Sequence, residues 1–130
     1  MTERRRKTRV LLADDSSVVR MGLSLALRTA DDIEIVGEAG TGQQAVEMAG
    51  RLHPDLILMD VSLPELDGIE ATRRIHAACP GLPIVGLTMY TDVAQRMLDA
   101  GAVDCLDKAL GSRALVAAVR ERATARGQDA

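Results

Sequence analysis

Aromatic side chains are almost absent from this sequence of 130 residues, which contains no Trp, no Phe and a single Tyr, Tyr90. Proteins that bind single-stranded nucleic acid commonly stack its bases on aromatic rings, so a surface of that kind is excluded. Long hydrophobic runs are also missing, and no stretch approaches the 18 apolar residues of a membrane-spanning helix. The basic residues near the N-terminus are not followed by an apolar segment, so we expect no secretory signal and no membrane partner.

Cysteine is scarce as well. Cys79 and Cys105 are 26 positions apart and form no CxxC pair of the kind found in zinc sites or redox motifs. We therefore expect both thiols to be reduced and the protein to be cytoplasmic.

Charge is unevenly distributed along a chain whose length fits one domain. The net charge of −3 argues against direct nucleic-acid binding. The first nine residues carry five basic side chains and one acidic, whereas the remainder carries 11 basic and 18 acidic, a net charge of −7. We expect residues 1–8 to be a basic flexible leader, 9–124 the folded domain, and 125–130 a flexible tail.

Five short apolar runs alternate with five longer amphipathic stretches. Such alternation predicts an α/β fold in which helices cover both faces of a five-stranded parallel sheet. The common strand order for five units of this kind is 2-1-3-4-5, the flavodoxin-like (βα)5 arrangement. The strands are expected at 10–13, 33–36, 56–59, 83–87 and 102–106, and the helices at about 17–29, 42–51, 68–78, 91–100 and from 112 onward.

Polar residues follow four of the five expected strands. Asp14 and Asp15 end the first, Asp60 the third and Thr88 the fourth, and Lys108 follows the fifth. In the order 2-1-3-4-5 the first and third strands are neighbours, so their three carboxylates meet at the sheet edge where ligands bind. Carboxylates so close together repel one another and favour a bound cation, and oxygen ligands suit Mg²⁺. A carboxylate can also attack phosphorus, with a lysine and a hydroxyl stabilising the phosphoryl oxygens.

Two other interpretations of these motifs are weaker. A single Asp at a strand end commonly caps a helix, and Asp15 is placed to do so, but that role does not explain the whole set. Residues 40–45 match the GxGxxA pattern of dinucleotide-binding proteins. This match follows the second strand instead of the first and leaves the strand-end residues unexplained, so we do not expect an oxidoreductase.

Taken together, these segments resemble the receiver domain of two-component response regulators over roughly residues 8–124. The matching pieces are LLADDSSVVR, GTGQQAVEM, DLILMDVSLPELDG, PIVGLTMY and GAVDCLDKAL. LTMY and the spacing of SLPELDG resemble the NarL/LuxR-like branch, whose members usually carry a C-terminal helix-turn-helix DNA-binding domain and regulate transcription.

The resemblance implies a role for each acidic residue. Asp60 would be the phosphoacceptor, and the reaction would require Mg²⁺. Asp15 and Asp60 would bind the ion directly, Asp14 would act through water, and the backbone carbonyl of Ser62 would complete the protein ligands.

The resemblance also implies a signalling switch. Lys108 would pair with the phosphoryl group, and Thr88 would follow it and move its loop. The donor would be a histidine kinase or a phosphotransfer protein, and a homodimer would form through the fourth and fifth βα units. No enzymatic activity is expected beyond self-phosphorylation and self-dephosphorylation on Asp60.

One position departs from the family pattern. The fifth strand of a receiver usually carries a Tyr or Phe that moves inward with the Thr, whereas this sequence has Cys105. We expect Tyr90, two residues after Thr88, to take part of that role. The substitution also leaves open a phosphorylation-independent interaction module on a degenerate receiver. A haloacid-dehalogenase-like phosphatase is a further alternative, although that family needs Asp-x-Asp and Asp14 and Asp15 are adjacent.

Overall fold

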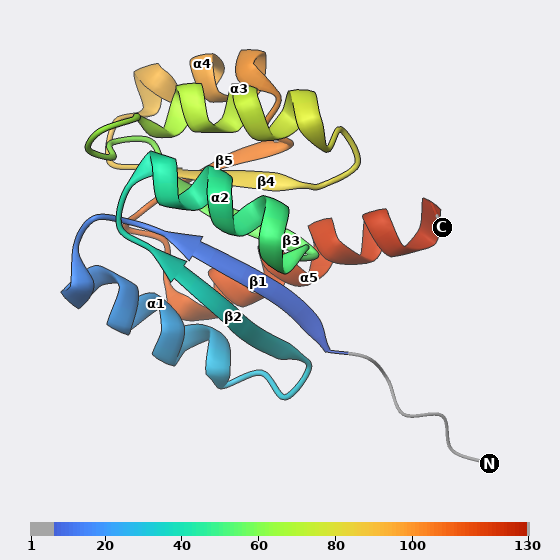
Figure 1. Cartoon of the computed structure of the whole chain (residues 1–130). Coiled ribbons are helices and arrows are strands. Elements are labelled where there is room, and N and C mark those ends of the chain that lie inside the picture. Colours follow the sequence, from blue (N-terminus) through green and yellow to red (C-terminus); the bar gives the residue numbers. More distant parts are fainter. Residues whose placement is uncertain (1–6, 130) are drawn as a thin grey trace.

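Strands and helices alternate along the whole of residues 7–129, the part of the chain that the computed structural model describes (Figure 1). The strands are parallel and form one sheet in the order β2-β1-β3-β4-β5, as the sequence predicts. The elements are β1 (Thr8–Ala13), α1 (Ser17–Arg28), β2 (Ile33–Ala39), α2 (Gly42–Leu52), β3 (Leu56–Asp60), α3 (Gly68–Ala78), β4 (Ile84–Thr88), η1 (Thr91–Val93), α4 (Ala94–Ala100), β5 (Asp104–Asp107) and α5 (Ser112–Asp129).

Helices cover both faces of the sheet. One face packs against α2, α3 and α4, and the other packs against α1 and α5 (Figure 1). Neighbouring residues of the central strands alternate between the two cores, with Leu11 and Ile57 in the first and Leu12 and Leu58 in the second. Because all of β3 and β4 and the last four residues of β1 are buried, these segments are nearly continuous apolar runs.

Short polar side chains begin three of the helices. The Ser16 hydroxyl accepts a hydrogen bond from the backbone N–H of Val19 at 3.2 Å, and Thr41 and Asp67 accept equivalent bonds at the starts of α2 and α3. Each bond satisfies a donor that the first turn of a helix leaves free. The GxGxxA match at 40–45 is therefore a loop followed by a helix cap.

The region around α4 differs from the sequence prediction. The helix expected at 91–100 begins as the short 3₁₀ turn η1, and α4 itself starts only at Ala94 without a side-chain cap. The strand expected at 102–106 lies at Asp104–Asp107. The residues before it instead close the turn after α4, since Ala102 N–H donates to Met97 and Val103 N–H donates to Ile84.

The structure describes the chain ends from residue 7 to residue 129, which includes part of the expected leader and most of the expected tail. Most of the expected leader at 1–8 lies outside the described residues, but Thr8 already pairs with Ile33 as the first residue of β1. At the other end α5 is helical to Asp129, so helix continues through 125–129, where a flexible tail is expected. None of the helices described within residues 7–129 has both the length and the apolar character needed to cross a membrane.

Candidate functional site

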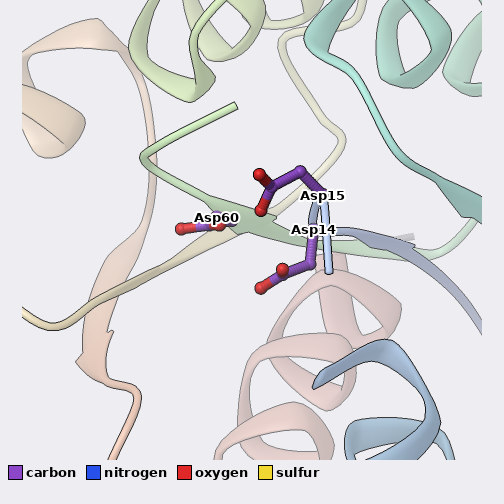
Figure 2. A group of neighbouring side chains, drawn as sticks. All are labelled: Asp14, Asp15 and Asp60. Atoms are coloured by element: carbon purple, nitrogen blue, oxygen red, sulfur yellow. The ribbon is translucent and has the colours of Figure 1, made fainter. Parts of the chain in front are cut away.

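Three carboxylates lie together at the carboxyl ends of β1 and β3. Oxygen atoms of Asp14, Asp15 and Asp60 are all within 4.8 Å of one another, and the side chains extend to the same side of the strand ends (Figure 2). Asp14 and Asp60 are buried, with 0% and 3% of their surface exposed, whereas Asp15 is exposed. The adjacency of β1 and β3 in the sheet brings these residues together.

Lys108 connects the two buried carboxylates. Its ammonium Nζ lies 2.8 Å from Oδ2 of Asp14 and 3.2 Å from Oδ2 of Asp60. The backbone N–H of Lys108 donates to the carbonyl of Thr88 at 2.9 Å, which fixes the start of the β5–α5 loop against the end of β4. The lysine therefore reaches the acidic cluster from a part of the chain nearly 50 residues beyond Asp60.

Backbone donors hold the same two carboxylates from the other side. The N–H of Ser16 donates to Oδ1 of Asp14 at 3.0 Å, and the N–H of Ser62 donates to Oδ1 of Asp60 at 3.2 Å. Each bond joins a residue to the one two positions earlier, so the turn after each strand aims the carboxylate. The structure thus places Ser62 beside Asp60, while a metal-binding role for its carbonyl stays a prediction.

The electrostatics of the cluster leave an excess of negative charge. Burial raises the pKa of Asp60 above its usual value and repulsion from Asp14 adds to this, while the Ser62 N–H and Lys108 act in the opposite direction. Burial alone would lower the pKa of Lys108, but the contacts with Asp14 and Asp60 outweigh it and raise that pKa. One ammonium cannot neutralise three carboxylates, so this oxygen-rich cluster fits a hard divalent cation.

Thr88 lies at the end of β4 next to the acidic cluster, but its hydroxyl is turned toward the following loop. Its Oγ1 donates to the carbonyl of Tyr90 at 3.1 Å and accepts from the N–H of Tyr90 at 2.9 Å. The side chain of Tyr90 itself is 66% exposed. The two residues are therefore joined through the backbone of Tyr90, and its ring lies at the surface.

Cys105 is the second residue of β5 and is not part of the acidic cluster. It pairs with Gly86 of β4, and its sulfur would be 2.9 Å from a Cβ at that glycine. Met97 of α4 fills the rest of the space above Gly86. Burial raises the pKa of the Cys105 thiol, and the charge of Asp104 adds to this effect.

Two residues that support the site, Gly68 and Arg20, were not predicted from the sequence to belong to it. Gly68 begins α3 so close to β3 that a Cβ would lie 1.9 Å from the backbone oxygen of Asp60. Arg20 of α1 donates from Nη1 to the backbone carbonyl of Asp14 at 2.5 Å. The glycine could have been suspected from its place after the helix-capping Asp67, whereas no local sequence signal indicates the role of Arg20.

Comparisons with known proteins agree with this geometry. A model of the response regulator receiver domain matches residues 10–120. The response regulator protein VraR of Staphylococcus aureus is 39% identical over 122 residues, covering 92% of this chain and 57% of VraR. The chain thus spans little more than half the length of this curated relative.

Solved structures give the same result. The response regulator domain of Thermotoga maritima CheB superposes with a TM-score of 0.83 at 33% identity, covering 92% of this chain and 98% of that one. The receiver domain of the putative response regulator NarL from Mycobacterium tuberculosis has a TM-score of 0.87 at 27% identity, with the same coverage of both chains. The predicted fold and the resemblance to NarL/LuxR-like receivers are confirmed.

Proposed function

This chain belongs to the response regulator receiver domain family, and on that premise we propose that it is a phosphorylation-activated signalling switch with Asp60 as the phosphoacceptor. The observation that carries the proposal is the contact of Lys108 with both Asp14 and Asp60 at the ends of β1 and β3. A buried carboxylate, a second carboxylate and an ammonium in direct contact form a site for a transferring phosphoryl group.

Asp60 is the best placed of the three carboxylates to act as nucleophile. The Ser62 N–H holds its Oδ1 and Lys108 holds its Oδ2, so the carboxylate is restrained in one orientation. A carboxylate oxygen would form a bond to phosphorus while the bond from phosphorus to the donor's imidazole nitrogen breaks. The electron pair of that bond stays on the imidazole, and an aspartyl phosphate results.

Asp14, Asp15 and Asp60, with the backbone carbonyl of Ser62, are the residues that would hold Mg²⁺. Mg²⁺ usually keeps several waters and uses few carboxylates, which suits a cluster that combines one exposed and two buried acids. When bound, the ion supplies positive charge to the phosphoryl oxygens. Asp15 and Asp60 would contact it directly and Asp14 through water.

Lys108 and Thr88 would convert phosphorylation into a change of shape. A phosphoryl group on Asp60 offers new oxygens to the Lys108 ammonium, which now contacts two carboxylates. The Thr88 hydroxyl would exchange its bonds to the Tyr90 backbone for one to the phosphoryl group, and the β4–α4 loop would move with it. Tyr90 and Cys105 would transmit that movement to the surface of the fourth and fifth βα units.

The partners follow from this chemistry. The donor would be a phosphohistidine on a histidine kinase or a phosphotransfer protein, acting in the cytoplasm. The changed surface of α4 and β5 would form a homodimer or bind an output partner. A second candidate is a phosphorylation-independent interaction module, which Cys105 favours because it replaces the usual aromatic residue of the fifth strand.

The direct test is incubation with acetyl phosphate and Mg²⁺, followed by intact mass measurement. We expect a gain of one phosphoryl group that is labile to base and is abolished by EDTA and by Asp60→Asn. Asp31→Asn is the matched control, because Asp31 is an exposed carboxylate in the loop between α1 and β2, away from the carboxyl ends of the strands. A modification that survives Asp60→Asn would contradict the assignment of Asp60, and an unmodified protein that still binds Mg²⁺ would favour the interaction module.

A further inference from the structure

Arg20 links three segments that surround the acidic cluster. Its side chain, only 19% exposed, extends from the second turn of α1. Nη1 donates to the backbone carbonyl of Asp14 at 2.5 Å, and Nε pairs with Glu38 near the end of β2 at 3.1 Å. The guanidinium lies beside Gly40, where a Cβ would be in ordinary contact with Nη1 at 3.5 Å.

The carbonyl that Arg20 binds belongs to the peptide group between Asp14 and Asp15. A peptide group is planar, so a hydrogen bond to its oxygen restrains the backbone of both residues at once. Asp14 has further restraints from Ser16 and Lys108. Within residues 7–129 no hydrogen bond or ion pair joins the Asp15 carboxylate to another group, so the backbone is the part of Asp15 that the surrounding structure restrains.

Glu38 determines how the guanidinium is used. The Glu38 carboxylate accepts from Nε of Arg20, so the ion pair of the arginine lies outside the acidic cluster. Nη1 remains to donate to the backbone carbonyl of Asp14. Charge-assisted hydrogen bonds of this kind are stronger and more directional than neutral ones. The arginine can therefore hold the turn without neutralising the carboxylates that a cation needs.

We propose that Arg20 is a positioning residue that fixes the Asp14–Asp15 peptide so that the Asp15 carboxylate faces Asp60 in a geometry that binds a divalent cation. This inference rests on the proposed function, in which those carboxylates hold Mg²⁺. Arg20 touches neither the ion nor the phosphoryl group and acts only through the backbone of the two aspartates.

The test compares Mg²⁺ affinity with stability in wild type, Arg20→Ala, Arg20→Lys and Arg120→Ala. Arg120 is the matched control, since it makes a bidentate ion pair with Asp32 away from the acidic cluster. We expect Arg20→Ala to weaken Mg²⁺ binding, measured by calorimetry with the metal alone, by about tenfold. Arg120→Ala should leave Mg²⁺ affinity within twofold of wild type, whatever its effect on the melting temperature.

Amide hydrogen exchange gives a readout that needs no metal. The Ser16 N–H, which donates to Asp14, should exchange faster in Arg20→Ala than in Arg120→Ala. If Arg20→Ala does not fold, Arg20→Lys carries the test, because one ammonium cannot bind the carbonyl and Glu38 as a guanidinium does. It should weaken Mg²⁺ binding by roughly threefold.

Two outcomes overturn the inference and are distinguishable. If wild type binds Mg²⁺ and the foldable Arg20 variants bind it equally well, Arg20 only stabilises the fold and the proposed function stands. If wild type itself binds no Mg²⁺ at millimolar concentration, the metal-dependent function fails, and the positioning role fails with it.

Discussion

At the scale of single residues, Asp60 is subject to influences of opposite sign. Burial and the neighbouring Asp14 favour its protonated form, whereas Ser62 and Lys108 favour the carboxylate, and the balance raises its pKa. If Asp60 is the nucleophile, as proposed, it must be ionised and so carry a charge that its burial disfavours. The two contacts to Asp60 are thus as important to the chemistry as the acid itself.

The raised pKa of Asp60 predicts how stability depends on pH in the metal-free protein. Folded Asp60 keeps its proton at pH values where the unfolded chain, with a pKa near 3.8, has lost it. The free energy of unfolding therefore falls as pH rises from that value through the raised pKa. Asp60→Asn stays neutral at every pH. Its free energy of unfolding relative to that of wild type should therefore increase over this pH range and become constant above it.

Urea denaturation with EDTA at several values between about pH 4 and pH 8 measures this difference. Asp31→Asn reports the effect of removing a carboxylate at an exposed position. A gap between Asp60→Asn and wild type that narrows as pH rises would show that the folded state lowers the pKa of Asp60.

At the scale of elements, the site depends on how closely α3 approaches β3. Gly68, the first residue of α3, lies against the backbone of Asp60 and Val61, and its N–H donates to the carbonyl of Val61 at 2.9 Å. Gly42 at the start of α2 is equally close to the backbone of Leu66. These contacts pack the β3–α3 loop between two helix starts and hold the turn that carries Ser62.

Gly68→Ala should move α3 away from β3, because the new Cβ would meet backbone atoms that cannot rotate aside. We expect a loss of about 1–3 kcal/mol in the free energy of unfolding and slower phosphorylation of Asp60. Gly81→Ala is the matched control, since nothing lies within 4 Å of a Cβ there. Chemical denaturation and acetyl phosphate kinetics check the prediction, and equal behaviour of the two variants would contradict it.

At the scale of the whole molecule, the large apolar side chains that are exposed among the residues with described side chains lie in two regions. One region is on α1, with Val18, Met21 and Leu25. The other follows β4 and surrounds β5, with Met89, Tyr90, Leu98, Val103 and Leu110. The second region contains the loop whose backbone at Tyr90 bonds to the Thr88 hydroxyl, so under the proposed function it is the surface on which phosphorylation would act.

Tyr90→Ala tests whether that surface transmits the signal. We expect the variant to accept a phosphoryl group at the wild-type rate, because its ring is exposed, and to lose most of any phosphorylation-dependent dimerisation. Sedimentation with and without acetyl phosphate and Mg²⁺ measures this. Val18→Ala, a truncation of a side chain on α1 that is 76% exposed, is the control. If Tyr90→Ala dimerises like wild type, Tyr90 does not replace the missing aromatic residue of β5.

The order of the elements, the sheet topology and the acidic cluster can all be predicted from the amino-acid sequence. Apolar strand runs and the polar residues at strand ends depend on neighbouring positions, so their pattern is readable along the chain. The parallel order then requires Asp14, Asp15 and Asp60 to meet at one edge. The same local reasoning misplaced the start of α4 and of β5. Before β5, Ala102 N–H bonds back to Met97 of α4, and Val103 N–H bonds to Ile84, 19 residues earlier in β4.

The contacts that hold the site in place become visible only once the chain is folded. Arg20 binds the carbonyl of Asp14, six residues earlier, and the carboxylate of Glu38, 18 residues later. A glycine is needed at position 68 because any side chain there would collide with the backbone of Asp60 in β3. The Thr88 hydroxyl forms hydrogen bonds with the backbone of Tyr90, although a threonine at this position could equally bond to other groups. Such contacts join groups that packing brings together, so they cannot be predicted from a repeating pattern along the sequence.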